Sequence, residues 1–210
     1  MPSYHDHKGL ILKENKIVIS EHSVEEMHEL GEQHLHAALM LCRENIHTGV
    51  QEVLAQKRQI DKKQYPDYWC FTAGGHCMES DFDPENPWSA DINAISRESL
   101  EEIGLGINFS ANERSYVLND STGQEFKVNI LNLWRFQNSL HIPKLEGAHP
   151  YNEDPLFSVL AMQVRDPNLN LSFTANPDEL SGLAWKPVAE LRKEKLTPWF
   201  DRYLNLINHE

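Results

Sequence analysis

Cationic side chains and cysteines are both scarce in this sequence of 210 residues. There are 19 Lys and Arg against 32 Asp and Glu, a net charge of −13 at pH 7, so neither a nucleic-acid duplex nor an anionic membrane is an expected partner. The three cysteines, Cys42, Cys70 and Cys77, are odd in number and too few for a disulfide scaffold, which predicts a reducing, cytoplasmic setting. An acidic chain can still bind a small phosphorylated ligand through metal ions.

Long apolar runs are missing as well. No stretch approaches the roughly 20 apolar residues that span a bilayer, and the N-terminal MPSYHDHKGLILKENK lacks the apolar segment of a secretory signal. Hydrophobic residues nevertheless make up 40% of the chain, enough for a core, which excludes a collagen-like, mucin-like or largely disordered chain. Because no repeat or low-complexity linker divides it, we expect one domain over residues 1–210.

The order of apolar and turn-forming segments predicts a mixed α/β domain. A hairpin around Glu14–Asn15 and a short helix over 23–31 form an N-terminal extension, 1–33. Further strands are predicted at 34–42, 50–58, 115–119, 125–136 and 156–164. The remaining helices are predicted at 91–103 and 197–209, with a strand that runs into a short helix within 183–193.

The helix at 91–103 is the most informative segment. At about 100° per residue, one narrow face for packing on a sheet comprises Ile92, Ile95, Ser99 and Ile103. Glu98, Glu101 and Glu102 occupy the arc beside that face, and like charges at these spacings repel one another. A hard divalent cation such as Mg²⁺ would turn this repulsion into binding; a solvated helix face is the alternative. Upstream, Gly74–Gly75 could direct a backbone carbonyl at the helix.

These segments resemble a known family. RESLEEIGL (97–105) is similar to the second half of the Nudix box, GX5EX7REUXEEXGU with U aliphatic, and Gly74–Gly75 resembles its start. Ser99 stands at a position where the pattern has an aliphatic residue. Asp81 stands where the pattern has its first glutamate, and the distance from there to Arg97 is eight residues longer.

The longer distance indicates an inserted loop at about 80–90 within a box over 72–105. Asp81 and Glu79 are both candidates to replace the first glutamate.

The resemblance implies an α/β/α sandwich with a mixed sheet and Mg²⁺- or Mn²⁺-dependent cleavage of a diphosphate. It implies that Glu98 and Glu102 bind metal, that Glu101 is a third ligand or orients water, and that the carbonyl of Gly75 completes the metal site. Arg97 would hold the glutamates by charge-assisted hydrogen bonds. Many relatives form dimers, so a homodimer is compatible with the resemblance.

The preceding segments resemble one branch of the superfamily, isopentenyl-diphosphate isomerase and its hydrolase-like relatives. The shared order is LKENKIVISEHSVEEMH, HLHAAL, VLAQKR, YPDYW and GGH. In the isomerases, histidines of these segments bind a metal, and the positions here are His28, His36 and His76, with His34 a close competitor for His36. Whether this set binds a second metal or fixes the N-terminal segment against the core stays open.

The isomerases also carry a catalytic cysteine two residues before the last of these histidines. Here that residue is Gly74, and neither Cys70 nor Cys77 is a natural replacement. Because isomerisation of an unactivated alkene needs a strong acid and a base, the sequence favours a hydrolase that acts on a nucleoside-diphosphate-like or other organic pyrophosphate. An isomerase with a different acid and a non-catalytic metabolite sensor remain the alternatives.

Several other residues have two interpretations each. Glu179 is expected to be structural rather than a catalytic base, and Glu146 and Glu153 are candidates for that base. A small basic cluster either meets substrate phosphate or lies on a solvated loop: Lys57, Arg58, Lys62 and Lys63. Three tryptophans are expected to be buried rather than to stack on a base: Trp69, Trp134 and Trp185.

Overall fold

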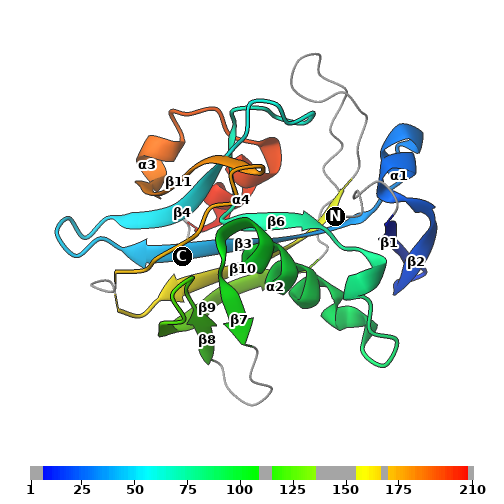
Figure 1. The fold of residues 1–210 in the computed structure, drawn as a ribbon, viewed down its shortest axis with the longest axis horizontal. Helices are drawn as coiled ribbons and strands as arrows, with labels where there is room; N and C mark the ends of the chain where they lie inside the picture. The colour runs from blue at the N-terminus through cyan, green and yellow to red at the C-terminus, as the bar shows by residue number, and fades with distance from the viewer. Residues whose placement is uncertain (1–6, 109–114, 136–154, 167–169, 208–210) are drawn as a thin grey trace.

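The computed structural model describes residues 7–108, 115–135, 155–166 and 170–207 (Figure 1). The strands are β1 (Lys8–Lys13), β2 (Lys16–Ser23), β3 (Leu35–Glu44), β4 (Gln51–Arg58), β5 (Trp69–Cys70), β6 (Ala73–His76), β7 (Gly106–Asn108), β8 (Ser115–Asn119), β9 (Glu125–Trp134), β10 (Leu156–Val164) and β11 (Leu180–Pro187). The helices are α1 (Val24–Leu30), α2 (Ala90–Ile103), α3 (Val188–Leu191) and α4 (Pro198–Ile207), with 3-10 turns at Glu79–Asp81 and Pro87–Ser89. Within the described ranges, no helix combines the length and apolar character needed to cross a bilayer.

Nine of these strands form one mixed sheet in the order β11-β4-β3-β10-β9-β8-β7, with β5 paired to β4 and β6 paired to β3. The central strands β3 and β10 run parallel to each other, and the other pairs are antiparallel. One edge of β3 is shared: its first half pairs with β6, through Leu39↔Ala73, and its end pairs with β4, through Cys42↔Val53. The β6 segment therefore lies beside the middle of the sheet, under α2.

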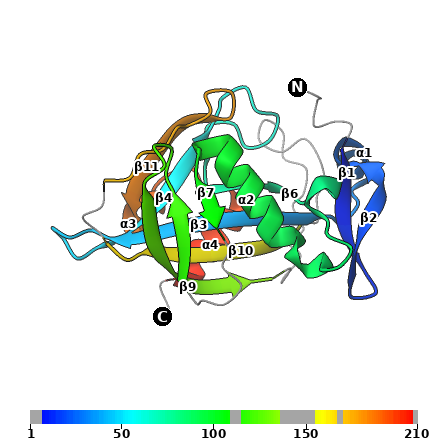
Figure 2. The ribbon, with the colours of Figure 1, turned by 60° about the horizontal axis from the view of Figure 1, so that its bottom comes forward.

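Helices cover both faces of this sheet, which confirms the predicted α/β/α sandwich (Figures 1 and 2). Their apolar side chains form a core on each face. The α2 side includes Ala94, Ile95 and Ile103, packed with Leu39 and Leu160. The α4 side includes Trp199, Phe200, Tyr203 and Leu204, packed with Met40, Phe71 and Val159. The continuous apolar runs of β3 and β10 are explained by these cores, because both faces of the two strands are buried.

The N-terminal segment folds as local sequence signals predict. The turn between β1 and β2 contains Glu14 and Asn15, both at positive φ, as a two-residue hairpin requires. Ser23 caps α1 and forms a capping box with Glu26, and Gly31 ends the helix in the left-handed conformation. This β1–β2–α1 unit docks on the end of β6, where the backbone N–H of Leu10 donates to the carbonyl of Cys77 (2.9 Å).

The sequence did not predict β5, β7 or the 3-10 turns of the inserted loop. These elements have two or three residues each, too few for a periodic pattern, and β5 and β7 exist because tertiary contacts supply their pairing partners. The predicted helix at 91–103 is confirmed, with Gly104 as its left-handed C-cap.

Candidate active site

The two most buried glutamates of α2 lie one helical turn apart on its inner side. Glu98 is 7% exposed and Glu102 is 6% exposed. They lie in the stripe that contacts the sheet, together with Ile95, Ser99 and Ile103, whereas the side chain of Glu101 is 45% exposed. The predicted arc of three glutamates is therefore divided: two carboxylates enter the interface with β6, and the third stays at its rim.

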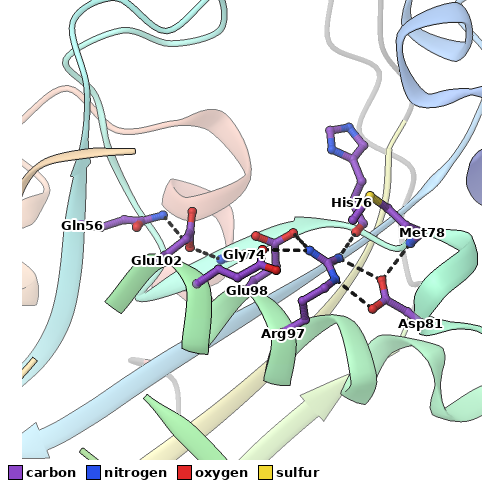
Figure 3. A network of polar contacts seen from close by, with 9 residues as sticks. Gln56, Gly74, His76, Met78, Asp81, Arg97, Glu98 and Glu102 are labelled. Carbon is purple, nitrogen blue, oxygen red and sulfur yellow. Dashed lines mark hydrogen bonds and ion pairs between the residues drawn. The ribbon is translucent and has the colours of Figure 1, made fainter. Parts of the chain in front are cut away.

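Glu102 is held by β6 and β4 (Figure 3). The backbone N–H of Gly74 donates to its Oε2 at 2.9 Å, and the side-chain amide of Gln56 lies 3.5 Å from the same oxygen. Gln56 had no predicted role, and nothing in its sequence context distinguishes it from a polar strand residue. These contacts fix the carboxylate over the start of β6.

Glu98 lies directly over Gly75. A Cβ atom at position 75 would collide with the Glu98 carboxylate, so the glycine makes room for it. Arg97 donates from Nη1 to Glu98 Oε1 at 2.7 Å, and the same nitrogen lies 3.4 Å from Glu101 Oε2. The glycine and the arginine together determine where the carboxylate of Glu98 can lie.

Arg97 distinguishes the two candidates for the first glutamate of the box, because its guanidinium pairs with Asp81. Its Nε and Nη2 donate to the two carboxylate oxygens of Asp81 at 3.0 and 2.9 Å, and Nη2 also donates to the carbonyl of His76 at 2.9 Å (Figure 3). Asp81 is buried, whereas Glu79 is exposed. The bidentate pair ties the inserted loop to α2.

The two buried carboxyl groups hold their protons more tightly than a surface glutamate. Burial raises the pKa of Glu98 to about 7 and that of Glu102 to about 8, and repulsion from the Glu98 charge adds to the shift at Glu102. Arg97 lowers the pKa of Glu98, and the N–H of Gly74 and the charge of Arg58 lower that of Glu102. A divalent cation fits this pair, because it would compensate the repulsion between two carboxylates that Gly74 and Gly75 hold in place.

Four histidines gather where the N-terminal unit meets β3 and β6: His28, His34, His36 and His76. The Nε2 atoms of His28 and His76 are 2.8 Å apart, and one ligand atom from each of His28, His34 and His76 lies within 4.8 Å of the others. His34 Nδ1 lies 2.7 Å from the carbonyl oxygen of Glu32, a bond that leaves Nε2 as its ligand atom. Burial, and then the charges of the neighbouring histidines, lower the pKa of His76, which favours the neutral form that binds metals.

This set differs from the predicted one by a single residue. The sequence predicted His28, His36 and His76, but the structure groups His34 with the first and last of these. The ring of His36 packs against the rings of His76 and Phe157, at centroid distances of 4.0 and 4.8 Å. The sequence alone could not separate two histidines that are two residues apart.

Position 74 has no room for the cysteine of the isomerases. A Cβ atom there would lie 2.9 Å from the carbonyl oxygen of Ala37 and 2.9 Å from the Cβ of Ala38, both on the paired strand β3. Cys77 is fully buried. Cys70 borders the cavity described next, and the hydroxyl of Thr197 donates to its sulfur at 3.5 Å.

A cavity of about 490 Å³ connects these groups. Its lining contains the three glutamates of α2, Gly74, Gly75, His28, His36 and His76. Three cations from the basic cluster line it as well, namely Arg58, Lys62 and Lys63. Its apolar lining includes Phe71, Phe157 and Trp199, none of which sequence reasoning selected, because buried aromatics also occur throughout any core.

The other residues singled out from the sequence lie partly inside and partly outside this cavity. Lys57 is not part of the cavity lining and pairs with Asp67 at 2.6 Å. Glu179 lines the cavity and pairs with Lys62. Trp69 is buried, and Trp134 and Trp185 pack partly buried against the cores. Glu146 and Glu153 lie outside the described residues.

No protein-family model matches this chain. Among curated proteins, an uncharacterized Nudix hydrolase from Listeria monocytogenes is 28% identical over 88 residues, which is 42% of this chain. The match spans 46% of that relative, about half its length.

Solved structures share the fold over most of the chain. A protein from Deinococcus radiodurans superposes with a TM-score of 0.56 at 12% identity, covering 95% of this chain and 98% of the other. A Nudix hydrolase from Alicyclobacillus acidocaldarius superposes with a TM-score of 0.51 at 16% identity, covering 81% and 89%. This chain therefore has the Nudix fold.

Proposed function

Because the chain has the Nudix fold and sets two buried glutamates over a pair of glycines, we propose that it is a metal-dependent pyrophosphohydrolase. Its substrate would be a nucleoside-diphosphate-like or other organic pyrophosphate. The observation that carries the proposal is the placement of Glu98 and Glu102, one turn apart and over β6, in the cavity of about 490 Å³.

Glu98 and Glu102 would hold Mg²⁺ or Mn²⁺, with Glu101 and the carbonyl of Gly75 as further ligands. The bound ion would supply Lewis-acid polarisation of a phosphoryl oxygen and a lowered pKa for an attacking water. Arg97 is a positioning residue in this proposal, because its guanidinium contacts Asp81, Glu98 and the carbonyl of His76. Glu101, exposed at the rim, is the glutamate best placed to orient water.

Arg58 is the cation best suited to receive a substrate phosphate. It lines the cavity, and its positive charge lowers the pKa of Glu102. Its Nε donates to the carbonyl of Gln64 at 2.9 Å, and within the described part of the chain its guanidinium makes no ion pair. A guanidinium fixed at one nitrogen can still donate a fork of hydrogen bonds to a phosphate.

The histidines form a candidate second site. His28, His34 and His76 present three imidazole ligand atoms, a set that suits Zn²⁺ or Mn²⁺. The isomerase alternative is not favoured at this site, because a cysteine at position 74 would collide with the backbone of β3.

Product release across a substrate panel tests the proposal. Nucleotide sugars, dinucleotides, nucleoside triphosphates and isoprenyl diphosphates would each be incubated with Mg²⁺, Mn²⁺ or EDTA. We expect turnover of one class, with release of phosphate or a monophosphate that EDTA abolishes. Metal binding without turnover of any class would contradict the proposal and favour a sensor, and alkene isomerisation without hydrolysis would favour an isomerase.

A further inference from the structure

Lys62 and Glu179 form an ion pair inside the cavity that the proposed reaction would use. Lys62 Nζ lies 2.5 Å from Glu179 Oε2, and the two side chains are 26% and 30% exposed. Both residues line the cavity together with Glu98 and Glu102. A lysine that would otherwise attract a phosphate is therefore already neutralised by a carboxylate of the same chain.

The backbone segment that carries Glu179 is held by several hydrogen bonds. The backbone N–H of Gln59 donates to the carbonyl of Glu179 at 3.1 Å, and the side-chain amide of Gln59 donates to the carbonyls of Pro177 and Leu180. The N–H of Asn176 donates to the carbonyl of Glu102 at 2.8 Å. The segment that carries Glu179 is thus tied both to the loop that carries Lys62 and to the end of α2.

The other two cations of the cavity are bound less tightly to carboxylates. Lys63 lies 3.7 Å from Glu25 and is 65% exposed, a distance and exposure at which an ion pair contributes little. The Nε of Arg58 is bound to a backbone carbonyl rather than to a carboxylate. Among the cations of this cavity lining, Lys62 is consequently the one with a close and partly buried counter-ion.

We infer that Glu179 is a specificity-determining residue, an internal counter-ion that a substrate phosphate must displace from Lys62. The inference rests on the proposed function. A single phosphate that binds Lys62 must displace Glu179, and it makes few other contacts that could compensate this cost. The displaced carboxylate then lies beside a phosphate of the same charge. A diphosphate would also bind Arg58 and, through the cation, the glutamates of α2. These additional contacts compensate the cost of displacing Glu179. Glu179 therefore favours diphosphate substrates over monophosphate products.

Calorimetric titration with two non-reacting probes tests this inference. Inorganic phosphate and methylenediphosphonate would be titrated, with saturating Mg²⁺, into the wild-type protein and into Glu179→Gln, Lys62→Gln and the double variant. We expect Glu179→Gln to tighten phosphate binding by about 3- to 10-fold, and to tighten diphosphonate binding less. Lys62→Gln weakens both, and adding Glu179→Gln to it tightens phosphate binding less than in the wild-type background, because only the repulsion between carboxylate and phosphate is then relieved.

Asp67→Asn provides the matched control. Lys57 and Asp67 form a pair of similar length, 2.6 Å, at the same β4–β5 connection, but neither residue lines the cavity. We expect this variant to bind both probes as the wild type does. Melting temperatures of all variants, and their Mg²⁺ affinity without the probes, separate these effects from unfolding or a damaged metal site.

Unchanged or weaker phosphate binding by Glu179→Gln would overturn the inference, as would equal tightening with and without Lys62. Failure of the wild type to bind either probe would also overturn it. In turnover assays, a fall in kcat of about 100-fold at constant KM would overturn it too, because Glu179 would then act on the reacting atoms. If the wild type binds both probes as expected but hydrolyses no member of the panel, the proposed function fails and the counter-ion inference stands.

Discussion

Glu98 and Glu102 differ from ordinary surface glutamates because burial raises the pKa of both carboxyl groups. Two such groups one turn apart destabilise the folded chain whenever both are ionised. The chain keeps them, and it places Gly74, Gly75 and Arg97 so that their positions are defined. A cation bound by both carboxylates, as proposed above, would compensate the repulsion between them.

Glu102→Gln separates the charge of this residue from its packing. The amide keeps the shape of the side chain and an oxygen that can accept from the N–H of Gly74. We expect turnover to fall by about 100-fold or more. The melting temperature of the metal-free protein at pH 8.5, above the pKa of about 8 of Glu102, should not decrease, because a buried charge has been removed. Steady-state kinetics and thermal unfolding measure the two effects.

Glu194→Gln is the control for this substitution. Glu194 is exposed, pairs with Lys186 and does not line the cavity, so its replacement should leave turnover within about twofold. Wild-type activity in Glu102→Gln would show that the reaction does not depend on this carboxylate.

The raised pKa values also predict how pH changes stability and metal binding. With pKa values of about 7 and 8 in the folded state, against about 4.3 for an unperturbed glutamate, the folded chain binds more protons than the unfolded chain between these limits. Without metal, these two groups therefore lower the free energy of unfolding as the pH rises from about 4.5 to about 8. A divalent cation needs the ionised form, so its affinity rises over the same range.

Thermal unfolding with and without Mg²⁺ measures this linkage. The rise in melting temperature caused by Mg²⁺ should be larger at pH 8.5 than at pH 6. In the double variant Glu98→Gln/Glu102→Gln, the dependence of that rise on pH should disappear. An equal rise at both pH values in the wild-type protein would show that these carboxylates do not bind the ion.

At the scale of elements, the two adjacent glycines of β6 have different neighbours, because β6 lies between β3 and α2. A Cβ atom at position 74 would meet the backbone of β3, which cannot move without disturbing the centre of the sheet. A Cβ atom at position 75 would meet the carboxylate of Glu98, at the end of a flexible side chain that can move. We therefore expect Gly74 to be required for the packing of β6 on β3, and Gly75 to be required for the position of the Glu98 carboxylate.

Alanine substitutions at the two positions test this division. Gly74→Ala should lower the free energy of unfolding by about 1–3 kcal/mol, as overpacking of a core does. Gly75→Ala should leave the melting temperature of the metal-free protein nearly unchanged but weaken Mn²⁺ binding by about 10-fold or more, because Glu98 is displaced. Denaturant unfolding and metal titration distinguish the two variants, and equal effects on stability would contradict the assignment.

At the scale of the whole molecule, the histidine cluster joins the N-terminal unit to the sheet. His28 lies on α1, whereas His76 ends β6 and His34 leads into β3. A metal ion bound to all three would act as a cross-link between the β1–β2–α1 unit and the rest of the chain.

Hydrogen exchange measures such a cross-link directly. Zn²⁺ should slow the exchange of backbone amides in α1 and β2, and His28→Ala should abolish this protection without changing exchange in β10 at the centre of the sheet. His47→Ala, on an exposed turn, is the control and should respond as the wild type does. Protection of α1 by Zn²⁺ in His28→Ala would place the ion elsewhere.

Features that depend on near neighbours along the chain were predictable from the sequence. The hairpin at Glu14–Asn15, the capped helix from Val24 to Leu30 and the end of α2 at Gly104 follow from turn and cap residues. The positions of Glu98 and Glu102 on one side of α2 follow from helical periodicity. The order of strands and helices predicted a mixed α/β domain, whereas the sandwich was implied by the resemblance to the Nudix box.

Contacts between residues far apart in the sequence were decided by the tertiary structure. The pairing of β6 with β3 brings Gly74 and Gly75 to α2, and the fold of the inserted loop selects Asp81 rather than Glu79 as the partner of Arg97. The grouping of His34 with His28 and His76, and the pair between Lys62 and Glu179, likewise join segments that no local pattern connects. Periodicity and capping act over a few residues, whereas the register of a sheet and the docking of its helices determine which distant side chains meet.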